Sequence, residues 1–151
     1  MSSFRLQRVQ KELRQLTEEP PSGISVDVAS LEDNLSELKM NLHGFENTLY
    51  EGETFQLLFQ FDENYPFHSP VVKFTGKIPI HPHVYSNGHI CLSILTTGWL
   101  PSLTIESVCL SIVSMLSSCR VKQRPPNDAS YVSRAGENPK LTQWRFDDDT
   151  V

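Results

Sequence analysis

Three short segments of alternating apolar and polar residues constrain the fold of this chain more than any other feature. Residues 38–42 read Leu-Lys-Met-Asn-Leu, residues 54–61 place phenylalanine or leucine at every second position, and residues 71–74 read Val-Val-Lys-Phe. A period of two is typical of a half-buried strand. The links are too short for the crossover helices that parallel strands need, so we predict an antiparallel meander. Residues 24–28 are a candidate for a further edge strand.

Two other segments carry the helical period. Residues 3–17 have an apolar side chain at every third or fourth position, which predicts an amphipathic helix, and Pro20 and Pro21 end it. Residues 104–118 are apolar over much of the helical circumference, which is typical of a buried central helix.

The end of the chain has no clear period. Residues 120–130 read as a loop, and the tail at about 131–151 is predicted to be irregular because Gly136 and Pro139 interrupt any helix. The length of 151 residues fits a single domain over residues 1–151. The predicted fold class is α+β, with a helix, a meander of about four strands, an irregular segment, a central helix and an irregular tail.

Composition excludes several classes of function. The net charge is −5. This argues against broad nucleic-acid binding, because such binding needs a basic face. No apolar run approaches the roughly 20 residues that span a bilayer, so we expect no membrane partner. Three widely spaced cysteines (Cys91, Cys109, Cys119) make a poor disulfide framework and favour a reducing compartment, the cytoplasm or nucleus.

Residues 78–95 gather three histidines and Cys91. His81 and His83 are two residues apart, as are His89 and Cys91, and this spacing does not match structural zinc sites. No pair of cysteines supplies the second pair of ligands that such a site needs, so we predict no metal. Asn87 and Gly88 predict a tight turn. Cys91 itself is open to two interpretations, a small buried apolar residue or an activated nucleophile.

The stretch "HPHVYSNGHICLSIL", followed by Trp99 and Pro101, resembles the active-site segment of ubiquitin-conjugating enzymes. That family carries His-Pro-Asn, then Gly-x-Ile-Cys-Leu, then Trp-x-Pro at similar spacing. The segments "KELRQLTEEPPSG", "LYEGETFQLLFQF" and "NYPFHSPVVKF" resemble the family's first helix, second strand and Tyr-Pro-Phe turn. The resemblance covers residues 6–129.

The resemblance implies the UBC fold and an enzyme that needs no cofactor. It implies that Cys91 accepts ubiquitin from the activating enzyme as a thioester and passes it to an amine with the help of a RING or U-box ligase. A thiol is partly ionised near pH 7, so no strong base is required. Two alternatives stay open: a non-catalytic scaffold that binds ubiquitin or a ligase, and an enzyme for another ubiquitin-like modifier.

The resemblance also assigns roles around the cysteine. His83 stands where the family has asparagine, and would either stabilise the oxyanion of the tetrahedral intermediate or brace the loop. His81 matches the family's first histidine and is predicted to be structural, together with the turn at Asn87 and Gly88. Asp128 matches the family's aspartate that orients or deprotonates an incoming lysine, with Asn127 as the alternative. His89 occupies a variable position and is assigned no role.

A histidine at position 83 combined with an irregular tail resembles the W-type subgroup, which is associated with transfer to the α-amino group of flexible protein N-termini. An α-amine has a pKa of about 7.7–8.0 against about 10.4 for lysine, so far more of it is neutral near pH 7. Trp144, Asp147 and Asp148 are expected to contact the substrate N-terminus. The alternative is that this tail is only a solvated end.

Partner surfaces follow from the same resemblance. Arg8 and Lys11, on the exposed face of the first helix, match the region that meets the activating enzyme. Phe67, Pro101 and Ser102 match the loops that dock ligases. An exposed phenylalanine on a turn fits an interface anchor, and the alternative is that Phe67 caps the core.

Overall fold

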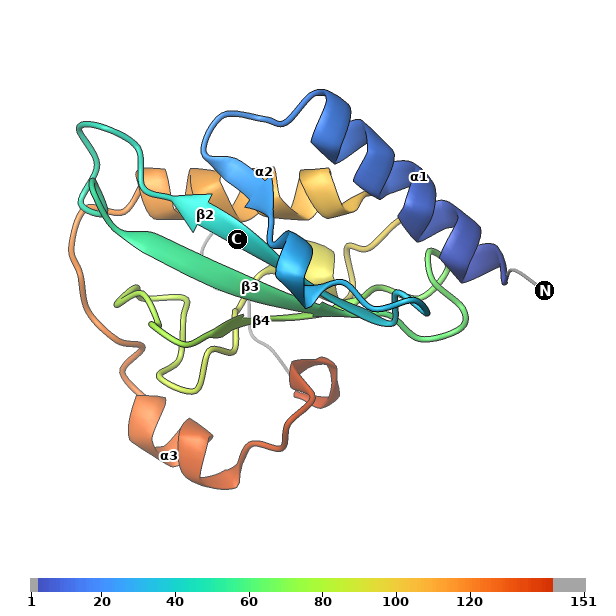
Figure 1. Cartoon of the computed structure of the whole chain (residues 1–151). Coiled ribbons are helices and arrows are strands. Elements are labelled where there is room, and N and C mark those ends of the chain that lie inside the picture. The colour runs from blue at the N-terminus through green and yellow to red at the C-terminus, as the bar shows by residue number, and fades with distance from the viewer. Residues whose placement is uncertain (1–2, 143–151) are drawn as a thin grey trace.

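The computed structural model describes residues 3–142. Its centre is one antiparallel sheet whose spatial order, β1-β2-β3-β4, follows the sequence, as the predicted meander requires (Figure 1). The strands are β1 (Ile24–Val26), β2 (Glu37–His43), β3 (Thr54–Gln60) and β4 (Val71–Thr75). The edge strand expected over 24–28 is confirmed for its first three residues, and a short 3-10 helix, η1 (Val28–Ser30), follows it.

The register of the sheet aligns the apolar positions of neighbouring strands. Leu42 lies opposite Phe55 and Met40 opposite Leu57, and on the other side of β3 Phe59 lies opposite Val72. These side chains are almost completely buried. Since alternate residues of a strand point to opposite faces, the alternation in the sequence puts one face of the sheet in the core.

Two helices cover that face. They are α1 (Phe4–Glu18) and α2 (Ile105–Ser117), and both lie on the same side of the sheet (Figure 1). The side chain of Ser3 caps α1, and Thr104 forms a reciprocal capping box with Ser107 at the start of α2. Seven of the thirteen α2 residues are buried, which confirms the prediction of a central buried helix.

The buried Glu12 joins the two helices. Its carboxylate accepts hydrogen bonds from the backbone N–H of Ile105 at 2.6 Å, from the Tyr65 hydroxyl at 2.6 Å and from Arg8 Nε at 3.0 Å. A buried carboxylate is tolerated only when it is paired and hydrogen-bonded in this way. Glu12 therefore fixes the start of α2 against the middle of α1.

The C-terminal half of the described chain contains a helix that the sequence pattern does not predict. Residues assigned to a loop and to the start of the tail form α3 (Asp128–Arg134), and short 3-10 helices occur at η2 (Ser93–Leu95) and η3 (Pro139–Leu141). In Figure 1, α3 lies on the side of β4 away from α1 and α2, with the segment between β4 and α2 looping across the space between them. Residues 131–134 of the tail predicted to be irregular are thus helical.

Among residues 3–142, no helix is both long enough and apolar enough to cross a bilayer. Trp144, Asp147 and Asp148 lie outside the described residues.

Candidate active site

Residues 83–91 form a small hairpin beside β4. Val84 pairs with Ile90, the Tyr85 N–H donates to the His89 carbonyl at 2.9 Å, and the Cys91 N–H donates to the His83 carbonyl at 2.8 Å. His83 and Cys91 are therefore directly opposite each other. Directly opposite residues of an antiparallel pair point to the same face.

The two faces of this hairpin have different environments. Val84 and Ile90 are buried in the core at 0% and 1% exposure. Tyr85 and His89 lie on the opposite face, which we call the polar face of the hairpin, where both rings contact Tyr131. From the alternation of side chains we expect His83 and Cys91 on this face as well.

The turn of the hairpin confirms the tight turn predicted at Asn87 and Gly88. The Gly88 N–H donates to the Tyr85 carbonyl at 2.9 Å, and the Asn87 side chain accepts from the His89 N–H at 3.1 Å. Gly88 has a positive φ of 91°, and a Cβ at this position would lie 2.2 Å from the Phe74 carbonyl oxygen. Only glycine allows the hairpin to approach β4 this closely.

His81 holds the start of the hairpin from inside the protein. It is 3% exposed, its Nε2 lies 3.1 Å from the Met115 carbonyl on α2, and its Nδ1 accepts from the His83 N–H at 2.9 Å. The two partners define a neutral ring with its proton on Nε2. This geometry supports the structural role expected for His81.

Arg124 holds the segment before the hairpin. Its guanidinium donates to the carbonyl oxygens of Pro79 at 2.7 Å, Ile78 at 3.3 Å and Val84 at 3.3 Å. A planar guanidinium can satisfy several carbonyls at once, which lysine cannot do in the same way. The loop from residue 78 to residue 84 is therefore fixed by a side chain that follows it in the sequence by 40 residues or more.

The three thiols have different surroundings. Cys109 is completely buried in α2, and burial raises the pKa of its thiol far above the usual range. Cys119 is partly exposed and lies 3.5 Å from the Tyr50 hydroxyl. Cys91 is 8% exposed and sits on the polar face of the hairpin, close enough for its charge to raise the pKa values of Tyr85 and Tyr131, for which burial is the larger cause.

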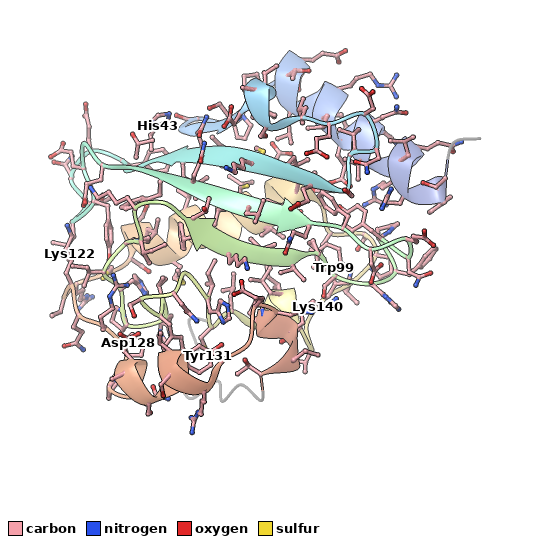
Figure 2. All side chains as sticks on the ribbon, turned by 60° about the horizontal axis from the view of Figure 1, so that its bottom comes forward. His43, Trp99, Lys122, Asp128, Tyr131 and Lys140 are labelled. Carbon is pink, nitrogen blue, oxygen red and sulfur yellow. The ribbon has the colours of Figure 1, made fainter. Side chains whose placement is uncertain are left out.

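The start of α3 contacts the hairpin through two adjacent side chains. Asp128 accepts from the Ser86 N–H at 2.8 Å, and Asn127 accepts from the Tyr85 hydroxyl at 3.0 Å. Both residues considered for the amine-orienting role thus lie against the hairpin, and Asn127 reaches Tyr85, which shares a face with Cys91. Figure 2 shows Asp128 and Tyr131 projecting from α3 in this region.

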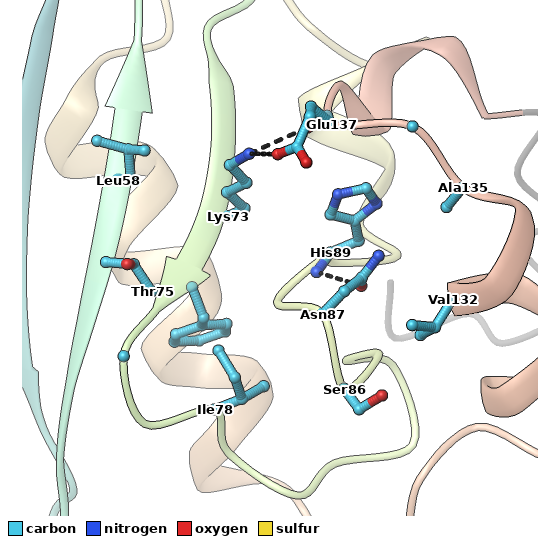
Figure 3. Close-up of a pocket in the computed structure, with 13 residues that line it drawn as sticks. Leu58, Lys73, Thr75, Ile78, Ser86, Asn87, His89, Val132, Ala135 and Glu137 are labelled. Atoms are coloured by element: carbon cyan, nitrogen blue, oxygen red, sulfur yellow. Dashed lines mark hydrogen bonds and ion pairs between the residues drawn. The ribbon is translucent and has the colours of Figure 1, made fainter.

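A groove of about 460 Å³ separates the outer surface of β4 from α3, and the turn of the hairpin forms its floor (Figure 3). Lys73 reaches across it to Glu137, with its Nζ 3.3 Å from the carboxylate and 3.1 Å from the carbonyl oxygen. His89 lines the groove and is 2% exposed. Burial lowers the pKa of His89 below its usual 6.5, and the charge of Lys73 acts in the same direction.

The expected partner surfaces lie elsewhere on the molecule. Phe67 is 64% exposed and stacks on Phe4, with ring centroids 5.7 Å apart, so Phe67 does not cap the core. Pro101 and Ser102 are also exposed. They follow Trp99 in the sequence, and the indole N–H of Trp99 donates to the Pro66 carbonyl at 2.8 Å.

One expectation about α1 needs correction. Lys11 is exposed, but Arg8 is not on the free face of the helix. Its guanidinium pairs with Glu12 and donates to the carbonyl oxygens of Pro101 and Leu103, both at 3.1 Å. The apolar period shows which helical positions face the core, but it does not show that a long side chain beside them bends toward a neighbouring loop.

No group of three or more histidine, cysteine, aspartate or glutamate residues within 3–142 is arranged to hold a metal ion. The sequence pattern also did not reveal two residues that hold the hairpin, Arg124 and Tyr131, or a role for His89, which Tyr131 contacts. Their partners lie about 40 residues away along the chain, where no local spacing could reveal them.

Comparisons with known proteins point to one family. The family model described as ubiquitin-conjugating enzyme matches residues 8–146. A Danio rerio protein named "Probable ubiquitin-conjugating enzyme E2 W-A" is 55% identical over 144 residues, which is 95% of each chain. "Ubiquitin-conjugating enzyme E2 W" of Caenorhabditis elegans is 52% identical over 152 residues and the full length of both chains.

Solved structures give the same result for the fold. The crystal structure of the ubiquitin conjugating enzyme E2 UbcA1 from Agrocybe aegerita superposes with a TM-score of 0.86 at 41% identity, covering 91% of this chain and 99% of that one. An E2 from Plasmodium falciparum superposes with a TM-score of 0.71 at 43% identity, covering 76% and 99% of the two chains. The UBC fold expected from the sequence is confirmed.

Proposed function

Because the chain belongs to the ubiquitin-conjugating enzyme family and is of its W type, we propose that it carries ubiquitin as a thioester on Cys91 and transfers it to the N-terminal α-amino group of a substrate protein. The activating enzyme supplies the ubiquitin, and a RING or U-box ligase docks near Phe67 and assists the transfer. Proteins with flexible N-termini are the substrates. The reaction takes place in the cytoplasm or nucleus.

The observation that carries this proposal is the pairing of Cys91 with His83 across the hairpin, where the Cys91 backbone N–H donates to the His83 carbonyl at 2.8 Å. From this backbone pairing we expect the imidazole of His83 to lie on the same face as the thioester sulfur. When an amine attacks the thioester carbonyl, a C–N bond forms and the oxygen becomes negatively charged. The C–S bond then breaks, the sulfur leaves as thiolate and the nitrogen loses a proton. A ring N–H of His83 is a suitable donor to the charged oxygen.

The choice of an α-amine follows from its acidity. At pH 7 roughly a tenth of α-amines are neutral, against well under a thousandth of lysines, because their pKa values are about 7.7–8.0 and 10.4. Asp128, the matched amine-orienting carboxylate, is already bonded to the Ser86 N–H. A site with little capacity to deprotonate lysine still serves a nucleophile that is neutral on arrival.

Charging with activating enzyme, ATP and ubiquitin tests the thioester. We expect wild type to form an adduct that a thiol reductant removes, Cys91→Ala to form none, and Cys119→Ala, which removes a partly exposed cysteine outside the hairpin, to form it normally. Absence of a wild-type adduct with ubiquitin contradicts the proposal. A parallel panel of ubiquitin-like modifiers then separates an enzyme for another modifier from a non-catalytic scaffold.

The His83→Asn variant tests the chemical part of the imidazole. Asparagine also donates a hydrogen bond, but from a different position than a ring nitrogen. We expect the variant to discharge to an α-amine more slowly than wild type at the same pH, because its donor no longer matches the position of the charged oxygen. An unchanged rate shows that His83 only braces the loop.

A further inference from the structure

One tyrosine of α3 covers part of the hairpin face that carries Cys91. The ring of Tyr131 stacks on Tyr85 with centroids 4.0 Å apart and an interplanar angle of 29°, and it meets His89 edge-on at 5.7 Å and 73°. Tyr131 is itself 4% exposed. Tyr85 and His89 form one half of the face, and His83 and Cys91 form the other half, about 7 Å further along the hairpin.

The hydroxyl of Tyr131 joins the hairpin to residues 137–142, which we call the C-terminal strap. It lies 2.7 Å from His89 Nδ1 and 2.9 Å from the Thr142 hydroxyl. Glu137, at the start of the strap, lines the groove beside His89 (Figure 3). Tyr131 therefore links His89 to Thr142 at the other end of the strap.

The Tyr131 hydroxyl links an imidazole nitrogen to a second hydroxyl in one connected series of hydrogen bonds. Connected hydrogen bonds polarise one another, so the series is stronger than its separate bonds.

Other contacts anchor the strap to the region of β4, independently of this series of hydrogen bonds. Lys140 Nζ donates to the Ser69 carbonyl at 2.7 Å, Pro139 is buried, and Glu137 pairs with Lys73. Tyr131 consequently links a fixed strap to the hairpin face next to Cys91.

We propose that Tyr131 is a positioning residue for the transfer step, which holds the Tyr85–His89 half of the hairpin so that Cys91 stays in register with His83. This inference rests on the proposed thioester at Cys91. Transfer depends on the angle and distance at which an amine meets the thioester, and small displacements of a reacting group reduce the rate strongly. Formation of the thioester, which the activating enzyme drives, depends less on this alignment.

The first test measures single-turnover discharge of purified thioester to a peptide whose only amine is its N-terminus. Tyr131→Phe keeps the ring and removes the hydroxyl, and Tyr131→Leu removes both. We expect Tyr131→Phe to lower the maximal discharge rate by about three- to tenfold and Tyr131→Leu by more than about tenfold, with the half-saturating amine concentration within about twofold of wild type. Ser133→Ala, which removes an exposed hydroxyl from the same helix, is the matched control and should discharge normally.

Discharge by both Tyr131 variants at the rate of Ser133→Ala overturns the inference and leaves the proposed function intact. A change in the half-saturating concentration alone also overturns it, because that places Tyr131 in substrate binding. If wild type forms no thioester, the proposed function fails instead, and a second measurement decides the role of Tyr131.

That measurement is site-resolved alkylation of the ubiquitin-free protein by iodoacetamide. Cys91 is 8% exposed, so a loosened hairpin should make it react at least about threefold faster in Tyr131→Leu. Cys109, which is completely buried in α2, reports global unfolding and should stay protected. An unchanged rate at Cys91, or an equal increase at Cys109, overturns a local positioning role.

Discussion

Single side chains that come late in the sequence determine the geometry around Cys91. Arg124 holds the carbonyl oxygens before the hairpin, and Tyr131 contacts His89 and Tyr85 on its polar face. His81 supports the same segment from inside the protein, through its contact with the Met115 carbonyl on α2. The cysteine is thus held in a rigid frame, as a site requires when its reaction depends on the direction of approach.

The buried His89 predicts a dependence of stability on pH. Burial and Lys73 lower the pKa of His89 below 6.5, the value of an exposed ring, whereas Glu137 acts in the opposite direction. Between pH 6.5 and the lowered pKa the unfolded chain binds more protons at this residue than the folded chain. Stability is therefore lost as the pH falls through this window, by at most about 1.4 kcal/mol at pH 5.5 from this group alone.

Urea unfolding at about pH 7.5 and 5.5 measures the effect. We expect wild type to lose more free energy of unfolding between the two pH values than His89→Gln, whose side chain does not titrate. Ser133→Ala, which removes an exposed hydroxyl from α3 and no titrating group, serves as a control and should lose as much as wild type. Equal losses in wild type and His89→Gln would falsify the assignment of a buried neutral imidazole.

At the scale of secondary structure, the hairpin depends on how closely it can approach β4. The Gly88 carbonyl accepts from the Phe74 N–H at 2.9 Å, and Lys73 forms a β-bridge with His89. These contacts connect the hairpin to the edge of the sheet. The hairpin therefore moves with the core and not as an independent loop.

Substituting two glycines separates this close approach from ordinary backbone strain. Gly88 and Gly52 have similar positive φ values, 91° and 78°, but a Cβ at Gly52 meets nothing within 4 Å. We expect Gly52→Ala to lower the free energy of unfolding by about 1 kcal/mol, the usual penalty for the left-handed region. Gly88→Ala should lower it by at least about twice as much and slow ubiquitin charging, because the hairpin must move away from Phe74.

Chemical denaturation and a charging assay on both variants check this expectation. The Gly52 variant is the control, since it carries the backbone penalty without the collision. Similar losses of stability in the two variants, with normal charging in both, contradict the account of the hairpin.

The limits of prediction from sequence are visible at this same scale. The periodic segments were predicted to within a few residues, because each buries one face in a common core. Helix α3 was not predicted, because its seven residues include one buried side chain, Tyr131, and so show no apolar period. Its stability comes from contacts of Tyr131, Asn127 and Asp128 with the hairpin, and such contacts between distant segments leave no local pattern.

In the site, too, features with a local sequence pattern could be predicted, and features that depend on distant contacts could not. The tight turn at Asn87 and Gly88 could be predicted from two adjacent residues, and the position of Cys91 from a motif. The correct environment of Arg8 could not, because it depends on the carbonyl oxygens of Pro101 and Leu103 more than 90 residues away. The role of His89 depends in the same way on Tyr131.

Across the whole molecule, the proposed ligase surface and the hairpin lie in separate parts of the fold. Phe67 and Phe4 stack on each other at the start of α1 and the loop before β4, and both are more than half exposed. Paired exposed aromatic rings are suited to serve as an interface anchor. Binding there and chemistry at Cys91 can therefore be tested separately.

The Phe67→Ala variant performs that separation. We expect ligase-stimulated discharge to fall by about tenfold or more, which corresponds to about 1.4 kcal/mol or more of binding energy, and unstimulated discharge to stay within about twofold of wild type. Val28→Ala removes another exposed apolar side chain, from η1, and should leave both rates unchanged. Equal stimulation of wild type and Phe67→Ala by a RING ligase rules out this docking surface.

The central claim is that the thioester on Cys91 is transferred to α-amines. The most direct measurement compares discharge at about pH 7 to two peptides, one with a free N-terminus and no lysine, the other N-acetylated with a single lysine. At this pH the neutral fraction of the amine is more than about a hundredfold larger in the first peptide than in the second. We predict discharge to the free N-terminus to be at least about tenfold faster, and equal or faster discharge to the acetylated lysine peptide contradicts the account.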